Sequence, residues 1–244
     1  MQLPLRLIER PEPRLSDGVV GPNAEALKAL ERSAQGNSSG YDALLLWGSP
    51  GAGKTFWLQA WAHALGDRAF WIDCGPSRGP DAAAEPSVAA RLRASMEAVT
   101  PGPSVWLLDN VDRADDTAAA ALFQLYNWVR EVGGRCVATS SAPPLRMALR
   151  DDLRTRLGQS LIFELHELND HEKKNALRER ADRLALPLSD ELLNYLMTHL
   201  PRDLGLLIRV VDALNDYALA RQRVATIPLL KELLESPDAD PRPL

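Results

Sequence analysis

The stretch from Ala43 to Thr55 constrains the fold of this chain more than any other part of its sequence. An apolar run with the length of a buried strand passes directly into Gly48-Ser-Pro-Gly-Ala-Gly-Lys-Thr, and residues 56–65 then show helical spacing up to Gly66. Strand, glycine-rich loop and helix in this order are typical of a phosphate-binding loop. The alternative is a glycine-rich turn that only joins a strand to a helix. It is disfavoured, because four fixed residues coincide with the required strand and helix.

Eight consecutive residues of this loop are candidate nucleotide ligands. They are Gly48, Ser49, Pro50, Gly51, Ala52, Gly53, Lys54 and Thr55. Glycines let successive backbone N–H groups face phosphate oxygens, and the N-terminus of the next helix adds the positive end of its dipole. We expect Lys54 to reach the β- and γ-phosphates of ADP or ATP, and the Thr55 hydroxyl to ligate Mg²⁺.

A second strand pattern, residues 104–110, ends in the carboxylate of Asp109. An Asp at the carboxyl end of a parallel strand near a phosphate loop is placed to hold Mg²⁺ through water. An Asp that only caps the next helix is the alternative. The complete phosphate loop upstream favours the metal-binding interpretation, so Asp109 and Thr55 are the candidate metal residues, acting through the nucleotide.

The rest of the chain predicts an α/β domain followed by a small all-helical lid. Further strands are expected at residues 69–73, 136–139 and 162–165, and helices of the α/β domain at 24–34, 56–65, 88–99 and 118–132. Helical patterns alone follow at 170–185, 189–200, 203–220 and 229–234. We predict a five-stranded parallel sheet flanked by helices. The predicted domains are 1–15 (extended peptide and linker), 16–167 (α/β), 168–235 (lid) and 236–244 (flexible tail). Six tryptophans fall on these apolar segments and are expected to have core or half-buried packing.

Composition excludes several classes of function. The 244 residues carry a formal net charge of −5, so no overall positive field attracts DNA or an anionic membrane, and DNA contact should be indirect or weak. Two cysteines are too few for a disulfide framework, and the four histidines lack metal-ligand spacing. The chain has neither a membrane-length apolar run nor a signal peptide. We expect a cytoplasmic protein.

The N-terminal segment alternates apolar residues before two prolines that keep it extended, and its candidate binding residues are Gln2, Leu3, Leu5 and Leu7. The leucines share one side of an extended chain, and the Gln2 amide can both donate and accept a hydrogen bond. The segment resembles a sliding-clamp-binding peptide. An edge strand or a terminal segment without a partner is the alternative.

Several motifs occur in the order found in one family of ATPases. They are Gly21 and Asn23 before the first helix, the phosphate loop, Asp109, a strand that ends at Pro143-Pro144, Leu153-Arg-Thr-Arg-Leu, and Leu200-Pro-Arg-Asp-Leu. From about Leu3 to Leu234 the chain resembles the DnaA/Hda family of AAA+ ATPases.

This resemblance implies roles for further residues. Gly21, Asn23 and the strand-end hydroxyl of Ser140 would lie at the nucleotide, and Arg202 would be the lid arginine that touches it. Arg156 would be an arginine finger acting in trans on the nucleotide of a neighbouring protein. The alternative for Arg156 is a surface salt bridge worth at most about 1 kcal/mol.

The resemblance also implies a function: negative regulation of replication initiation. A protein of this kind carries nucleotide, with ADP expected, binds the DNA polymerase III beta sliding clamp, and stimulates hydrolysis of DnaA-bound ATP. No DNA-binding domain is expected after the lid. Self-association into a homo-oligomer is left open.

Two departures from the family pattern bear on catalysis. Asn110 occupies the position of a second carboxylate, and Ser141-Ala142 replaces Asp-Arg. An amide cannot take a proton from water, so we expect weak or no intrinsic ATPase activity, although Asp112 is a nearby carboxylate that could substitute. A helicase loader, a self-contained remodelling ATPase and another nucleotide-dependent replication adaptor are the alternatives.

Overall fold

A computed structural model describes residues 12–36, 42–76, 85–98 and 104–235. The clamp-peptide prediction for Gln2, Leu3, Leu5 and Leu7 and the predicted tail 236–244 lie outside the described residues. The chain divides into two compact units between Glu167 and Leu168, an α/β unit and a helical unit.

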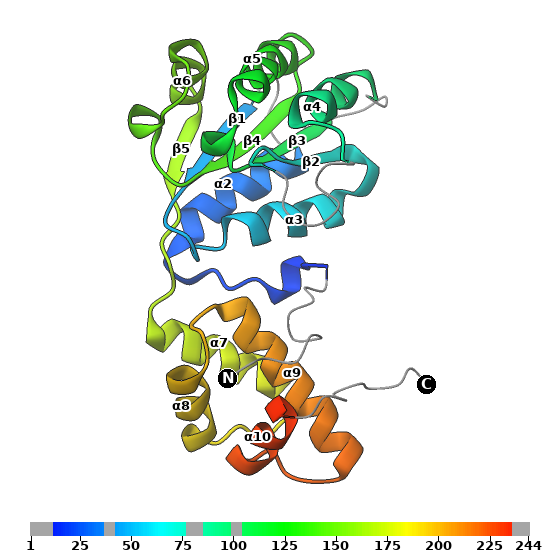
Figure 1. Cartoon of the computed structure of the whole chain (residues 1–244), viewed down its shortest axis with the longest axis vertical. Helices are drawn as coiled ribbons and strands as arrows, with labels where there is room; N and C mark the ends of the chain where they lie inside the picture. Colours follow the sequence, from blue (N-terminus) through cyan, green and yellow to red (C-terminus); the bar gives the residue numbers. More distant parts are fainter. Residues whose placement is uncertain (1–11, 37–41, 77–84, 99–103, 236–244) are drawn as a thin grey trace. The chain divides into compact units, whose positions relative to one another are not determined.

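The α/β unit is built on one sheet of five parallel strands in the order β2-β3-β4-β1-β5 (Figure 1). The strands are β1 (Asp42–Trp47), β2 (Ala69–Asp73), β3 (Val105–Asp109), β4 (Arg135–Ser140) and β5 (Leu161–Glu164). Every residue of β3 and β4 is buried. Central parallel strands are covered on both faces, which explains why β3 is a continuous apolar run up to Asp109 rather than an alternating pattern.

Helices cover both faces of the sheet. They are α2 (Ala24–Gln35), α3 (Lys54–Leu65), α4 (Val88–Glu97), α5 (Asp116–Glu131) and α6 (Asp151–Gly158). Figure 1 shows α2 and α3 on one face and α4, α5 and α6 on the other, and each group has its own buried core against the sheet. The expected core role of the tryptophans is confirmed by Trp106, which stacks on Phe70 and meets Trp128 edge to face.

The lid consists of α7 (Asp170–Arg183), α8 (Asp190–His199), α9 (Leu204–Arg221) and α10 (Ile227–Glu235) around a leucine-rich core. Polar side chains set three of the helix starts. Asn169 and Glu172 form a capping box at α7, Ser189 caps α8, and Asp203 caps α9. A paired guanidinium–carboxylate contact between Arg180 and Asp212 joins α7 to α9.

The structure differs from the sequence prediction mainly at short elements. The Arg-rich segment before β5 contains a 3₁₀ turn, η5 (Pro144–Arg146), and the helix α6, which the sequence did not predict. Further single turns are η1 (Leu15–Asp17), η2 (Gly21–Asn23), η3 (Gly66–Arg68) and η4 (Val111–Arg113). None of the helices in the described part of the chain has the length and apolar character needed to cross a bilayer.

Candidate nucleotide site

The strand order places the phosphate loop and the Asp109 carboxylate at the same edge of the sheet. The loop follows β1, Asp109 ends β3, and β4 lies between these two strands. Trp47, the last residue of β1, is in register with Ser140, the last residue of β4. Parallel strands present their carboxyl ends at one edge, where α/β folds bind ligands.

Glycine is required at several positions of the phosphate loop. Gly51 and Gly53 have φ angles of 91° and 87°, values that residues with a Cβ rarely adopt. A Cβ at Gly48 would lie 2.2 Å from the backbone oxygen of Leu165. The loop therefore has the tight curl that turns backbone N–H groups toward an anion.

The Lys54 side chain is buried within this loop. Its ammonium donates hydrogen bonds to the backbone oxygens of Gly48, at 2.6 Å, and Ser49, at 2.9 Å. Burial lowers the pKa of Lys54, and the carboxylates of Asp109 and Asp112 act in the opposite direction. A cation that is held by main-chain oxygens and has no direct carboxylate partner can exchange those oxygens for phosphate oxygens.

Asp109 is fully buried, and only one of its two carboxylate oxygens has a hydrogen-bond partner among the described residues. The Thr139 hydroxyl donates to its Oδ1 atom, whereas its Oδ2 atom has no hydrogen-bond partner among the described residues. Burial raises the pKa of this carboxyl group; the hydroxyls of Thr139 and Thr55 lower it, Asp73 raises it, and Lys54 lowers it. An unpartnered buried carboxylate oxygen beside the Thr55 hydroxyl fits a Mg²⁺ ion with its waters.

Asn110 adopts a left-handed backbone conformation with φ of 55°. Its backbone N–H donates to the Thr139 hydroxyl at 3.0 Å, and its side-chain amide donates to Asp73 Oδ1 at 3.0 Å. Asn tolerates this conformation better than most residues, so the backbone gives one physical reason for an amide at this position. Its side chain is engaged with the carboxylate at the end of β2.

Thr139 is a site residue that the sequence reasoning missed. Ser140, whose hydroxyl was predicted to lie at the nucleotide, is buried. This hydroxyl donates to the backbone oxygen of Ala142 at 2.7 Å. Successive side chains of a strand point to opposite faces, so only one of the two neighbours can face Asp109. The sequence does show a second hydroxyl residue, Thr139, next to Ser140. Choosing between the two requires knowing which face of the sheet each side chain points to.

The predicted residues before α2 lie at the same end of the unit as the segment after β5. Asn23 is buried, and its side-chain amide forms two hydrogen bonds with the backbone of His166, at 2.9 and 2.8 Å. Gly21 has a φ of 49° within η2. Asn23 therefore joins the start of α2 to the segment after β5, and the nucleotide contacts predicted for Gly21 and Asn23 stay predictions.

Arg156 lies on the last turn of α6. Its guanidinium contacts Gln159 Oε1 at 3.4 Å and lies over the ring of Phe123, 6.0 Å from the centroid. With Arg130 and two neighbours on α5, Arg156 lines a surface pocket of about 500 Å³. Arg150 and Arg154 form ion pairs with Asp152 and Asp151, but Arg156 forms none with any described residue.

Arg202 belongs to the lid, where it lies between α8 and α9. Its guanidinium pairs with Asp170 Oδ2 at 3.1 Å, and its backbone oxygen accepts a hydrogen bond from the buried Lys173 ammonium, also at 3.1 Å. Asp203 next to it caps α9. The first turn of α7 therefore fixes both the main chain and the side chain of Arg202.

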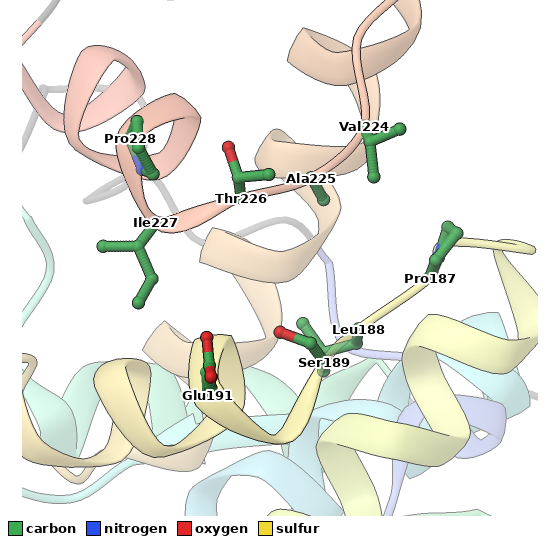
Figure 2. A pocket seen from close by; sticks show the side chains of 9 residues that line it. All are labelled: Pro187, Leu188, Ser189, Glu191, Val224, Ala225, Thr226, Ile227 and Pro228. Carbon is green, nitrogen blue, oxygen red and sulfur yellow. The ribbon is translucent and has the colours of Figure 1, made fainter.

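Other candidate ligand sites lack the required chemistry. No group of three or more His, Cys, Asp or Glu residues in the described segments could hold a metal ion. Figure 2 shows a lid pocket of about 570 Å³ between the start of α8 and the connection from α9 to α10. Its walls are mainly apolar, and Glu191 is the charged side chain that lines it, so it offers no cation for a phosphate.

Two family models match this chain. Residues 44–165 match the model described as ATPase family associated with various cellular activities (AAA), and residues 170–234 match the model described as Hda, lid domain. The two matches coincide with the two units of the fold, the sheet with its flanking helices and the four-helix lid.

Solved structures with the same fold include two from replication initiators. Domain III of DnaA from Thermotoga maritima is 20% identical, with 97% of this chain and all of that chain covered and a TM-score of 0.64. AMPPCP-bound DnaA from Aquifex aeolicus is 20% identical, with 86% and 68% covered and a TM-score of 0.62. The RuvB Holliday junction branch migration motor of Thermotoga maritima is 19% identical, with 93% and 72% covered and a TM-score of 0.61. At these identities the similarity concerns the fold.

Proposed function

The chain belongs to the AAA family of ATPases and is an Hda-type, DnaA-related AAA+ replication regulator, and from this membership we propose that it switches off the initiator DnaA. In this proposal the protein binds ADP or ATP with Mg²⁺, docks on the sliding clamp, and stimulates hydrolysis of the ATP bound to DnaA. The observation that carries the proposal is the lid-domain match over residues 170–234.

The residues around the phosphate loop fit a nucleotide with Mg²⁺. Among the described residues, the buried Lys54 ammonium donates to two backbone oxygens, and one buried oxygen of Asp109 has no hydrogen-bond partner. Lys54 would bind the phosphates, while Thr55 and Asp109 would hold the Mg²⁺ ion, which neutralises phosphate charge when bound. DnaA from Aquifex aeolicus holds the ATP analogue AMPPCP on the same fold.

Slow turnover follows from the identity of the residue after Asp109. Asn110 cannot accept a proton, and its amide is already paired with Asp73. A protein that hydrolyses its own ATP slowly can keep one nucleotide while it acts on a partner. The resemblance to the DnaA/Hda family, rather than the slow turnover, is the reason to assign ADP as the working nucleotide.

We assign the trans-acting role to Arg156. Its guanidinium is half-buried, is placed over Phe123, and is free of any carboxylate in the described residues, unlike Arg150 and Arg154. A planar, permanently charged fork can offset the charge that develops on the γ-phosphoryl group of a neighbour's ATP. Arginine fingers supplied in trans are worth roughly 10³ to 10⁵ in rate.

The test measures phosphate release from DnaA-bound ATP in the presence of clamp-loaded DNA. Arg156→Ala should lose the stimulation while it still folds and binds ADP. Arg156→Lys should recover little, because lysine lacks the planar fork. Arg154→Ala, which removes an ion-paired guanidinium on the same helix, is the matched control and should stimulate like the unchanged protein.

Two results would contradict this proposal. Full stimulation by Arg156→Ala would move the role to Arg154 or Arg150. No stimulation of DnaA by the unchanged protein, together with binding to a replicative helicase, would favour a helicase loader instead.

A further inference from the structure

Asp112, in the turn η4 directly after Asn110, is held in an unusual way. Its Oδ2 atom accepts hydrogen bonds from both the backbone N–H of Ser141, at 3.1 Å, and the Ser141 hydroxyl. Its Oδ1 atom is buried and has no hydrogen-bond partner among the described residues. The carboxylate is thus fixed through one oxygen, and the other is a buried acceptor without a donor in the described structure.

The arrangement repeats the one at Asp109. Thr139 and Ser141, two residues apart at the end of β4, each donate a hydroxyl hydrogen bond to one carboxylate: Thr139 to Asp109 at the end of β3, and Ser141 to Asp112 in η4. In both carboxylates the second oxygen is unpartnered in the described structure. The end of β4 therefore orients two carboxylates rather than one.

The Asp112 carboxylate also lies within electrostatic reach of the phosphate loop. Burial is the main influence on the pKa of Lys54 and lowers it, and the negative charges of Asp109 and Asp112 both raise it. Asp112 therefore belongs, with Asp109, to the carboxylates that surround the Lys54 ammonium.

A rival carboxylate, Asp73, is less available. Its Oδ1 atom accepts hydrogen bonds from the Asn110 amide, at 3.0 Å, and from the backbone N–H of Gly75, at 2.9 Å. These two donors occupy that oxygen and tie it to Asn110 and to the loop after β2.

We propose that Asp112, oriented by Ser141, is the carboxylate that takes the proton of the attacking water in the slow intrinsic hydrolysis of a bound nucleoside triphosphate. The inference rests on the nucleotide site of the proposed function. As the water oxygen bonds to the γ-phosphorus, Asp112 accepts one proton from that water. The bond between the γ-phosphorus and the bridging oxygen breaks, and the nucleoside diphosphate leaves with that oxygen and its electron pair. Ser141 is a positioning residue.

The experiment uses the full chain and compares four variants with the unchanged protein. Asp112→Asn keeps the oxygen that accepts from Ser141 and removes the basic group. Asp116→Asn, the same change at an exposed position on α5, is the matched control. Ser141→Ala removes the orienting hydroxyl, and Ser141→Thr keeps one. Single-turnover phosphate release with ATP and Mg²⁺ is measured for each, together with calorimetric binding of ADP and of a non-hydrolysable triphosphate analogue.

Asp112→Asn should slow hydrolysis by about 10²-fold, the lower end of what general base catalysis contributes. Its affinity for ADP should stay the same, and its affinity for the triphosphate analogue relative to ADP should rise about two- to tenfold, because a negative charge facing the γ-phosphate is removed. Ser141→Ala should slow hydrolysis and Ser141→Thr should restore it. Asp116→Asn should behave like the unchanged protein in every measurement.

The assignment is overturned if Asp112→Asn hydrolyses ATP at the unchanged rate, or if the unchanged protein binds ATP without releasing any phosphate. A fifth variant, Asp73→Asn, tests the rival carboxylate: a loss that appears with it and not with Asp112→Asn would transfer the role to Asp73. Failure of the unchanged protein to bind ADP is a different result, because it would reject the proposed nucleotide site itself.

Discussion

At the scale of single residues, Lys54 has the environment of a group that exchanges partners. Its ammonium is buried, and its hydrogen bonds go to two backbone oxygens of its own loop. Burying a charge is costly unless it is paired, and backbone oxygens compensate only in part. Phosphate oxygens in the same loop would supply the missing negative charge, so the environment of Lys54 favours an anion.

We therefore expect Lys54→Ala to weaken ADP binding by about 10- to 100-fold or more, the loss of one hydrogen bond to a charged group. Calorimetric titration of ADP with Mg²⁺ measures the change. Lys28→Ala removes an exposed lysine of α2 and should leave the affinity unaltered. An ADP affinity that Lys54→Ala does not reduce would contradict the site.

Most of the main residues of the site could be predicted from the sequence, because their motif fixes both residue type and local conformation. Lys54, Thr55 and Asp109 lie within a contiguous loop or at a strand end. Thr139 and the pairing of Asn110 with Asp73 could not be predicted in the same way. They depend on which β4 side chains point to the same face of the sheet as Asp109, and on which strands lie beside β3. Sequence spacing gives neither.

At the scale of elements, the lid depends on α9, whose apolar side forms the middle of the lid core. Leu207 on this helix is fully buried, and Leu219 on the same helix is 69% exposed. Leu207→Ala should destabilise the lid by about 2–5 kcal/mol through lost burial and a residual cavity. Leu219→Ala should change stability by less than about 0.5 kcal/mol.

Hydrogen exchange of the lid amides measures this difference and reports on the lid separately from the α/β unit. Leu207→Ala should speed exchange in α7, α8 and α10 as well as in α9, because all four helices share the core. Equal protection in the two variants would mean that Leu207 does not have the packing seen here.

Elements with long apolar patterns were predicted well, and short polar ones were not. Helix α6 buries only Leu153 and Leu157, and charged residues occupy most of its other positions. Two apolar residues one turn apart are too few to show a helical period, and its formation depends on packing against α5. The strand order is likewise a property of tertiary packing, since β4 lies between β1 and β3 although it follows both in the chain.

At the scale of the whole molecule, the proposed activity separates into parts that different segments supply. The phosphate loop would hold the nucleotide, Arg156 would act on DnaA, and the first residues would bind the clamp. No single side chain is needed for more than one of these contacts. Variants in one segment should therefore leave the other two activities measurable, which makes the three assignments independent of one another.

The proposed clamp contact brings the protein close to DnaA and takes no part in the hydrolysis itself. A six-residue peptide buries little area, so its affinity should be modest, and its effect is to raise the local concentration of the regulator near DnaA.

Gln2→Ala combined with Leu5→Ala should remove clamp binding in a pull-down and leave ADP affinity unchanged. Arg6→Ala is the matched control, because Arg6 lies in the same segment and is not among the predicted clamp-binding residues. Normal clamp binding by a chain that lacks residues 1–10 would show that the clamp is recognised elsewhere. Stimulation of DnaA should fall in the double variant only when clamp-loaded DNA is present, since Arg156 itself is untouched.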